Sequence, residues 1–362
     1  MSLREVIDGI EALEPGRFDE ALLAAYARRG VPRRPIRFHT PSFKAYATSE
    51  LAGRKGSWPA VSVTGGACKL QCDHCKAKIL EPMIAATSPE ALWRVANDAI
   101  AGGAGGMLLS GGSNHRDEVE YGPFLPVVRR IKDQHPAFRI AMHTALVDRA
   151  MADAIRAAGV DAAMLDIIGS QDTLTQVYHL KRPVADFEAS LAHLCDAGLD
   201  VVPHIVIGLH YGTLLGEWQA LEMIARHRVK ALVLVVAMPI YAGVQRPFGV
   251  PPGAEVGRFF ADARDAMGDT PVLLGCARPA GRAKIEIDAY AVMAGLDGIA
   301  HPADGIVELA MRSGRDTSVH SACCSIGLDD ADAPRIAPEA LIEAGRRTRR
   351  HSLRIPLVVA NA

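Results

Sequence analysis

The feature that most constrains the fold of this chain is a regular alternation of short apolar runs and amphipathic helical stretches. The eight runs cover residues 60–64, 106–110, 138–144, 162–168, 200–208, 230–237, 271–275 and 297–301. Because they are continuously apolar rather than alternating, the strands that they predict would be buried on both faces, as in a parallel sheet.

The stretches between these runs have helical periodicity and start signals. Thr87-Ser88-Pro89-Glu90 combines a capping hydroxyl with a proline in the first turn. Further helices are expected near residues 119–134, 149–158, 184–196, 217–227, 254–266, 282–294 and 305–312. Eight strand–helix units close a (β/α)8 barrel of the TIM type, and an open doubly wound sheet is the alternative.

The length of 362 residues fits one α/β barrel with additions at both ends. We expect residues 57–315 to form the barrel. Residues 1–56 would precede it as two short helices and a proline- and arginine-rich extended stretch, and residues 316–362 would follow it as an extension. Hydrophobic residues make up 49% of the chain, which is enough to bury a large core.

Charge and hydropathy exclude several kinds of protein. The net charge of −1 gives no reason to expect nucleic acid or an anionic membrane as partner. No apolar run reaches the ~20 residues that span a bilayer, and the amino terminus has no signal-peptide pattern. We therefore expect a cytoplasmic protein, in which seven cysteines favour metal or redox chemistry over disulfides.

The most specific motif is a cysteine triplet that follows the first predicted strand. The segment "TGGACKLQCDHCKAK" spaces Cys68, Cys72 and Cys75 as Cys-x3-Cys-x2-Cys. Three such thiolates can converge on zinc or on an iron–sulfur cluster. A closed zinc site would need a fourth ligand, and Asp73 and His74 are squeezed between two of the cysteines. On a [4Fe–4S] cluster, three thiolates leave one iron open for a substrate, like the open position of catalytic zinc.

With this motif and its barrel, the chain resembles the radical S-adenosylmethionine (radical SAM) enzymes over about residues 57–312. The resemblance implies that Cys68, Cys72 and Cys75 are catalytic ligands of a [4Fe–4S] cluster whose open iron binds S-adenosylmethionine. It also implies reductive cleavage of S-adenosylmethionine to a radical that abstracts hydrogen from an unactivated carbon.

The resemblance also assigns cofactor-binding positions at the carboxyl ends of later strands. Gly111 and Gly112 match the glycine motif that meets the methionyl ammonium, although a tight turn would explain them equally well. Asp166 matches a polar position that can hold ribose hydroxyls, or is a helix cap.

Further positions complete this assignment. The stretch that lines adenine corresponds to Val206, Ile207 and Gly208, and His143 ends its strand at the same face. Two positions depart from the family pattern: Ser113 replaces an acidic residue, and His74 replaces an aromatic residue before the third cysteine.

The other cysteines separate into two kinds. Cys195 ends a helix before the fifth strand and is expected to be a buried structural thiol. Cys276 lies just past the seventh strand, whereas Cys323 and Cys324 lie in a β-prone stretch after the last helix. Ten residues of that stretch at ~3.3 Å each cover about 33 Å. This stretch is therefore long enough to return to the barrel mouth. There the three thiols would either bind a second cluster or pack as unliganded side chains.

Two details of this second site stay open. Its fourth ligand could be Ser321, Ser325 or His320. Arg278, close to Cys276 on the functional face, is predicted to act catalytically by orienting substrate, with a structural ion pair as the alternative.

Over nearly its whole length the chain also resembles the archaeal-type lipoyl synthases, which work as two related radical SAM proteins. The shared segments are "VSVTGGACKLQCDHCKAKILEPM", "SGGS", "GCARPAGRAKIEIDAYAVMAGLDGIAHP" and "CCSI". The resemblance implies sulfur insertion at C6 or C8 of an octanoyl chain on a carrier protein, with an auxiliary [4Fe–4S] cluster as sulfur donor. It also implies a paralogous partner and an electron donor such as ferredoxin or flavodoxin.

Two other functions remain open on the residues alone. The first is a radical SAM enzyme of another class, such as a methyltransferase, a rearrangement enzyme or a cofactor-maturation enzyme. The second is an iron–sulfur scaffold or inactive subunit, against which the intact cysteine triplet argues.

Overall fold

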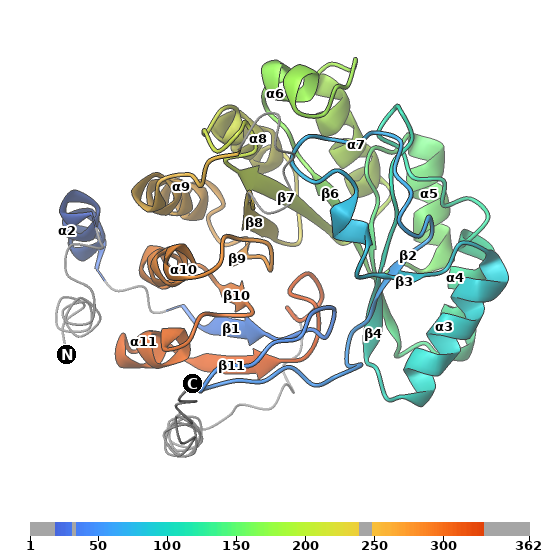
Figure 1. Ribbon diagram of the computed structural model, residues 1–362, viewed down its shortest axis with the longest axis horizontal. Helices are drawn as coiled ribbons and strands as arrows, with labels where there is room; N and C mark the ends of the chain where they lie inside the picture. The colour runs from blue at the N-terminus through green and yellow to red at the C-terminus, as the bar shows by residue number, and fades with distance from the viewer. Residues whose placement is uncertain (1–18, 31–33, 239–247, 329–362) are drawn as a thin grey trace, which may run out of the picture.

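A single parallel sheet forms the centre of the computed structural model, which describes residues 19–30, 34–238 and 248–328 (Figure 1). Its strands are hydrogen-bonded in the order β11-β1-β10-β9-β8-β7-β6-β5-β4-β2-β3. The strands are β1 (Ile36–His39), β2 (Ala60–Ser62), β3 (Ile84–Ala85), β4 (Gly106–Ser110), β5 (Arg139–His143), β6 (Ala162–Asp166), β7 (Val201–Ile207), β8 (Leu232–Val236), β9 (Val272–Leu274), β10 (Gly298–Ala300) and β11 (Thr317–His320).

All eight predicted strands are confirmed, as β2 and β4 to β10, and they follow one another across the sheet in chain order. The helices lie on the outer side of the curled sheet (Figure 1). They are α2 (Glu20–Arg29), α3 (Pro89–Ala101), α4 (Leu125–Gln134), α5 (Arg149–Ala158), α6 (Gln171–Gln176), α7 (Ala185–Asp196), α8 (Glu217–Ala225), α9 (Gly253–Ala266), α10 (Arg282–Ala294) and α11 (Ile306–Arg312), with one 3-10 turn, η1 (Lys78–Leu80).

Local sequence signals explain where several helices begin. The hydroxyl of Ser88 accepts a hydrogen bond from the Ala91 N–H at 3.2 Å and caps α3, as predicted. The helices α5 and α10 have the predicted bounds. Helix α4 begins later than expected, because Gly122 and Pro123 interrupt the helical pattern.

The sheet curls into a partial TIM-type barrel and does not close as a (β/α)8 barrel. Between β10 and β2, where a closed barrel would seal, β1 and β11 extend the β10 edge instead. Within the described residues no strand pairing joins β11 to β2 or β3. The barrel therefore has an open seam.

Both segments that we expected to flank the barrel contribute a strand to it. Strand β1 lies in the 1–56 segment, and β11 lies in the 316–362 segment. Ile36 and Phe38 of β1 are fully buried against the helical layer, and each such burial contributes about 1.5–3 kcal/mol. The boundaries expected at residues 56 and 316 therefore cut through one continuous sheet.

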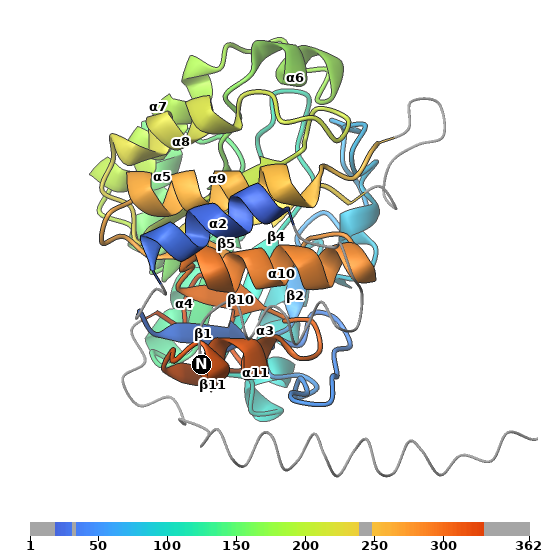
Figure 2. The ribbon, with the colours of Figure 1, turned by 90° about the vertical axis from the view of Figure 1, so that its left-hand side faces the viewer.

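Helix α2 confirms the second of the two expected N-terminal helices, whereas the first lies outside the described residues, as does the chain after residue 328. It lies across the outside of α9 and α10 (Figure 2). The hydroxyl of Tyr26 donates to the Gly257 carbonyl at 2.7 Å, and the Asp19 N–H donates to the Tyr290 hydroxyl at 3.0 Å.

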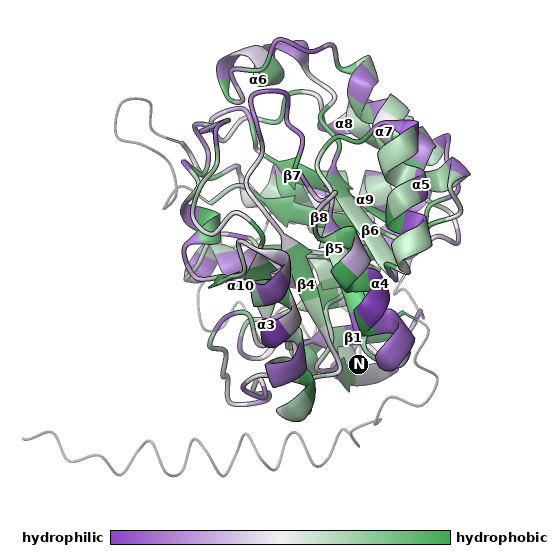
Figure 3. Ribbon diagram, turned by 90° about the vertical axis from the view of Figure 1, so that its right-hand side faces the viewer, coloured by the Kyte–Doolittle hydropathy of each residue, from purple (hydrophilic) through white to green (hydrophobic). Residues whose placement is uncertain are grey.

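Two apolar layers follow from the alternation of side chains along each strand. The larger layer packs between the sheet and the helices, and Figure 3 shows the apolar strands behind the more polar surfaces of α3 and α4. The smaller layer fills the inside of the curl, and its members include Trp58, Met164, Val233, Leu273 and Ile326. None of the helices in the described ranges is long and apolar enough to cross a bilayer.

Candidate functional site

The three cysteines of the motif lie in the loop that follows β2, residues 64–77, which we call the cysteine loop. Because β2 ends at Ser62, this loop stands at the carboxyl edge of the sheet, where barrel enzymes place their reactive groups. Cys72 is buried, and Cys68 and Cys75 are half-buried; all three thiols are free of disulfides.

The glycine pair after β4 packs directly against this loop. A Cβ atom on Gly112 would lie 2.0 Å from the Ala67 carbonyl oxygen and 2.6 Å from Cys68 Cβ, so only glycine fits here. The Gly112 N–H donates to the Thr64 hydroxyl at 2.7 Å. Gly111 and Gly112 thus have a packing role that holds the cysteine loop, whether or not they also contact a ligand.

The donor set of the cysteine loop fits an iron–sulfur cluster better than a single ion. No three potential ligand side chains in the described ranges gather closely enough to hold one metal ion. Thiolates around a cluster bind different irons and therefore stand farther apart than the ligands of one ion. Burial raises the pKa of Cys75 to about 11 and also raises that of Cys72, so the bound metal would have to displace the proton.

Polar side chains on β5, β6 and β7 meet inside the curl beside this loop. Nε2 of His143 lies 3.7 Å from Oδ1 of Asp166, and both side chains are 31% exposed. Burial lowers the pKa of His143, but Asp166 outweighs it and the pKa is raised overall. Burial pushes the pKa of Asp166 up, and His143 outweighs this and lowers it. The structure therefore brings together two residues that were predicted separately as cofactor-binding positions, and both are partly exposed.

His204 completes this group. Its ring centroid lies 5.8 Å from that of His143, and Nδ1 lies 3.0 Å from the Val202 carbonyl. Burial and the charge on His143 lower the pKa of His204 to about 4, so its ring is neutral at pH 7.

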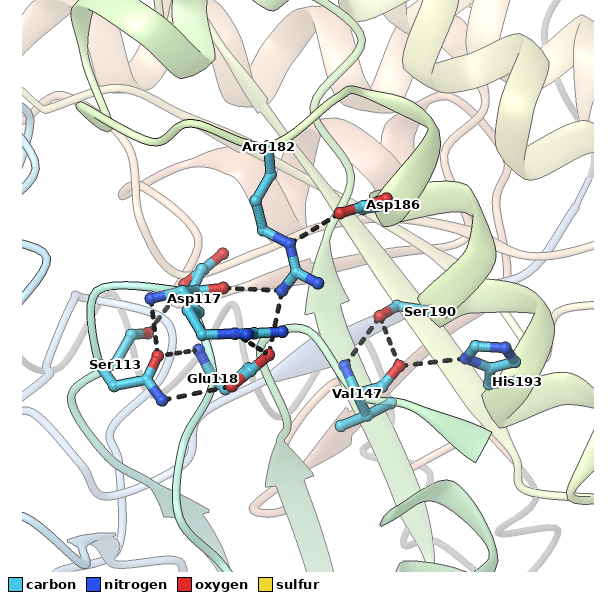
Figure 4. A network of polar contacts seen from close by, with 10 residues as sticks. Ser113, Asp117, Glu118, Val147, Arg182, Asp186, Ser190 and His193 are labelled. Atoms are coloured by element: carbon cyan, nitrogen blue, oxygen red, sulfur yellow. Dashed lines mark hydrogen bonds and ion pairs between the residues drawn. The ribbon is translucent and has the colours of Figure 1, made fainter. Parts of the chain in front are cut away.

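A buried acid lies close to the glycine pair, where the sequence suggested that none was present. The Ser113 hydroxyl donates to Oδ1 of Asp117 at 2.8 Å (Figure 4). Burial raises the pKa of Asp117 to about 6, and its charge in turn raises the pKa of Cys72. Asp117 therefore supplies an acidic side chain four residues beyond Ser113.

Arg182 fixes this segment to the helical layer (Figure 4). Its guanidinium donates to Glu118 at 3.1 Å and to Asp186 of α7 at 2.7 Å. These contacts hold the loop that carries Asp117 against the segment after β6.

An aromatic neighbour compensates for the histidine before the third cysteine. The rings of His74 and Tyr178 lie 5.1 Å apart at 33°, and Tyr178 is buried. Burial raises the pKa of Tyr178, and the charges of Asp166 and Cys72 raise it further. Nδ1 of His74 is buried without a hydrogen-bond partner. Such an orphan nitrogen fits a site built to receive a ligand.

The side chains of the stretch predicted to line adenine do not all face the inside of the curl. The side chain of Ile207 is fully buried in the helical layer, and that of Val206 packs with both layers. Gly208 has φ +76 and donates to the buried carboxylate of Glu217 at 2.8 Å. Because its side chain faces the helical layer, Ile207 could contact a ligand inside the curl only through its main-chain atoms.

The structure brings the second cysteine trio together. Cys276, Cys323 and Cys324 all pack in the apolar layer inside the curl, on the turn after β11 and the loop after β9. Burial and the charge on Cys323 raise the pKa of Cys276. A shared hydrogen bond lowers the pKa of Cys323 and raises that of Cys324. Of the proposed fourth ligands, Ser325 lies 3.8 Å from the Cys323 sulfur. Cys195 lies apart, half-buried at the end of α7.

Arg278 is not free to act on substrate, contrary to the prediction. A guanidinium has five N–H donors, and each has an acceptor here. Nε and Nη2 bind the carboxylate of Asp288 at 2.5 and 2.9 Å. The other three donors bind the carbonyls of Gly275, Ala300 and His301 at 2.6, 2.8 and 3.0 Å. With both side chains of the ion pair 0% exposed, Arg278 has a structural role.

A lysine from the segment after β1 stands beside Cys276 and was missed in the sequence. Lys44 Nζ donates to the Cys276 carbonyl at 3.1 Å. Burial lowers the pKa of Lys44, and Cys276 partly offsets this. No local pattern identifies Lys44, Tyr178 or Asp117, because each reaches the site only through the tertiary fold.

Comparison with known proteins identifies the fold. No family model matches the sequence, and no curated protein is similar to it. The structure is similar to HydG, a maturase of the [FeFe]-hydrogenase, with TM-score 0.57 and 12% identity over 98% of this chain and 94% of that chain. It is also similar to methylornithine synthase, PylB, with TM-score 0.52 and 12% identity over 96% of each chain.

A second HydG structure, from Carboxydothermus hydrogenoformans, gives TM-score 0.54 and 14% identity over 92% of this chain and 81% of that chain. At these identities the likeness is one of fold. The chain has the partial TIM barrel of the radical SAM type.

Proposed function

We propose that this chain is a radical SAM enzyme that inserts sulfur into a protein-bound octanoyl chain, as in lipoyl synthesis. The observation that carries the proposal is the presence of two separate groups of free cysteines in one radical SAM-type barrel. Cys68, Cys72 and Cys75 stand at its carboxyl edge, and Cys276, Cys323 and Cys324 pack inside its curl.

In this proposal the first trio holds a [4Fe–4S] cluster with one open iron for S-adenosylmethionine. When bound, these two groups would supply the radical chemistry that removes hydrogen from an unactivated carbon, with an external reductant supplying the electron. The protein's own side chains orient S-adenosylmethionine and exclude water. His143 and Asp166 offer polar groups for its hydroxyls, and the rings of His74 and Tyr178 offer aromatic faces beside the cysteine loop.

The second trio would hold the auxiliary cluster that donates sulfur. Its surroundings support an aliphatic substrate, since Met164, Val233 and Leu273 belong to the same apolar layer. A hydrocarbon chain is compatible with apolar side chains of this kind, whereas an uncompensated charge would be costly beside them. An octanoylated carrier protein, a paralogous radical SAM partner and a ferredoxin or flavodoxin complete the proposal.

Iron and sulfide counts after anaerobic reconstitution test the second cluster. We expect about eight irons per chain in the wild type and about four after C276A/C323A/C324A. C195A is the matched control, because that cysteine lies away from both trios, and it should retain the wild-type count. Iron content unchanged by the triple substitution would refute the second cluster.

Mass spectrometry of an octanoylated carrier peptide tests the reaction. Incubation with the reconstituted chain, its partner and a reductant should add the mass of sulfur to the peptide and release 5′-deoxyadenosine. Release of 5′-deoxyadenosine without sulfur addition would favour another reaction class. A loaded cluster that releases none under strong reduction would favour a scaffold role.

Another radical SAM class is the second candidate, and one observation favours it. Cys323 and Cys324 are buried among apolar side chains, where unliganded thiols also pack well. The solved proteins of similar fold are a hydrogenase maturase and a methylornithine synthase. A maturation or rearrangement reaction with one catalytic cluster would fit these facts.

A further inference from the structure

We propose that Asp73 is a positioning residue that fixes the cysteine loop in register with the segments that follow β6 and β7. The inference rests on the radical SAM part of the proposed function and is independent of the substrate. Asp73 is one of the two residues between Cys72 and Cys75, so any movement of its backbone moves both thiols.

The Asp73 carboxylate binds three side chains from three segments. Oδ1 lies 2.5 Å from Lys76 Nζ and 3.0 Å from Nε2 of His179. Oδ2 lies 2.8 Å from the Tyr211 hydroxyl. That hydroxyl also lies 2.9 Å from the Gln176 carbonyl, and its single proton favours the charged acceptor. Because Lys76 is local, His179 and Tyr211 provide the long-range attachment.

The backbone supports the same attachment. The Asp73 N–H donates to the Val177 carbonyl at 2.8 Å, so main chain and side chain both bind the segment after β6. One residue thereby holds the loop at two points. A loop fixed in this way cannot rotate about either contact alone.

All three side-chain partners of Asp73 have left-handed backbone conformations. Lys76 has φ 47, and His179 and Tyr211 each have φ 55. This conformation is unfavourable for a non-glycine residue and persists where the surrounding structure enforces it, often at functional sites. Three strained residues directed at one carboxylate indicate that their placement matters more than their own stability.

The attached segments also carry groups of the proposed cosubstrate site. His179 follows Tyr178, whose ring packs on His74. Tyr211 lies in the turn closed by the Gly212 N–H and the Gly208 carbonyl at 2.8 Å. Asp73 therefore links the thiols, the ring pair and the Gly208 turn, and its loss should change how S-adenosylmethionine meets the cluster.

The test compares D73A and D73N with a matched carboxylate at the opposite edge of the sheet. Asp161 also binds two cations, Lys132 and Arg139, each at 2.9 Å, and accepts the Ile140 N–H at 2.7 Å. D161A removes an equivalent network far from the cysteine loop. It should lower the melting temperature and leave the cysteine loop unchanged.

In the reconstituted protein, we measure the electron paramagnetic resonance spectrum of the reduced cluster and the affinity for S-adenosylmethionine. D73A should alter the spectral change caused by S-adenosylmethionine and weaken its binding at least about tenfold, as with other outer-shell groups. D73N keeps an acceptor for Tyr211 and should recover part of the loss. D161A should match the wild type in both measurements.

In the metal-free protein, hydrogen exchange of residues 68–80 and alkylation rates of the thiols test the attachment itself. The exchange and alkylation rates should rise in D73A and, more weakly, in Y211F. If D73A does not fold, the rates of Y211F provide the test. Unchanged rates would overturn the proposal even if the chain binds no cluster. Raised rates with an unchanged spectrum and affinity would also overturn it, because Asp73 would then only stabilise the loop.

Discussion

Among single residues, Arg278 and Asp288 form an ion pair whose side chains are both 0% exposed. Removing the guanidinium would leave the buried carboxylate with Lys284 Nζ at 3.5 Å and the Ala303 N–H at 2.7 Å, and breaking a buried ion pair in this way typically costs about 3–5 kcal/mol. We therefore expect R278M to lower the free energy of unfolding by this amount, measured by urea denaturation of the metal-free chain.

The exposed pair Arg149 and Asp153 is the control, at 2.9 Å with both side chains more than half exposed. R149M should leave the urea midpoint unchanged, because solvent screens such a pair. An R278M variant of normal stability that lacked turnover would instead support the catalytic role predicted from the sequence.

The contact of His143 with Asp166 predicts a pH dependence. The raised pKa of His143 gives stability that is lost as pH rises through that pKa; the lowered pKa of Asp166 gives stability that is lost as pH falls through it. The contact should therefore contribute most between about pH 4 and 6.5. D166N should lower the pKa of His143, followed by NMR titration of its ring. An unshifted titration would show that the two side chains do not interact.

At the scale of elements, β1 is the early strand that pairs with two late ones, β10 and β11. Phe38 is fully buried, and phenylalanine-to-alanine changes in cores cost about 3–5 kcal/mol. We expect F38A to lower the free energy of unfolding by that amount in urea denaturation. I84A, at a 45% exposed site on the edge strand β3, should have little effect. Equal midpoints for both variants would mean that β1 is not part of the sheet.

The same scale shows how far the sequence predicts the fold. Eight strands were predictable because their runs are long and continuously apolar, such as Leu232–Val236. Strand β1 was not, because four residues between prolines and arginines carry too little pattern. Its place is set by pairing with β10 and β11, which begin about 260 and 280 residues later and which no local signal encodes.

The candidate site divides in a similar way. The cysteine triplet was readable because its spacing is local. The packing role of Gly112 and the saturation of Arg278 depend on groups from other elements, such as Ala67 and Asp288. Whether Cys276 lies near Cys323 depends on the path of the chain after α11. From the sequence, only the length that this segment can span was predictable.

For the whole molecule, the two apolar layers consist mainly of aliphatic and aromatic side chains from the strands and helices, and cysteines are few among them. Removing iron with a chelator should therefore leave the helical circular dichroism signal unchanged. The melting temperature should fall only because the folded state loses the stabilisation that a bound cluster gives it. Apo and reconstituted protein should be compared under anaerobic conditions. Loss of the helical signal on chelation would mean that the cluster organises the fold.

The place of β1 also has a consequence for synthesis of the chain. Its partners emerge from the ribosome only after some 260 further residues, a wait of roughly 10–50 s at usual elongation rates. Throughout that time a strand with two large apolar side chains, Ile36 and Phe38, is without a partner and could pair with another chain. Proline and arginine before it (Pro32, Arg33, Arg34 and Pro35) and proline after it (Pro41) are residues of the kind that hinder such pairing. The prolines and arginines that make β1 hard to predict from the sequence would thus also hinder its pairing with other chains until β10 and β11 have been synthesised.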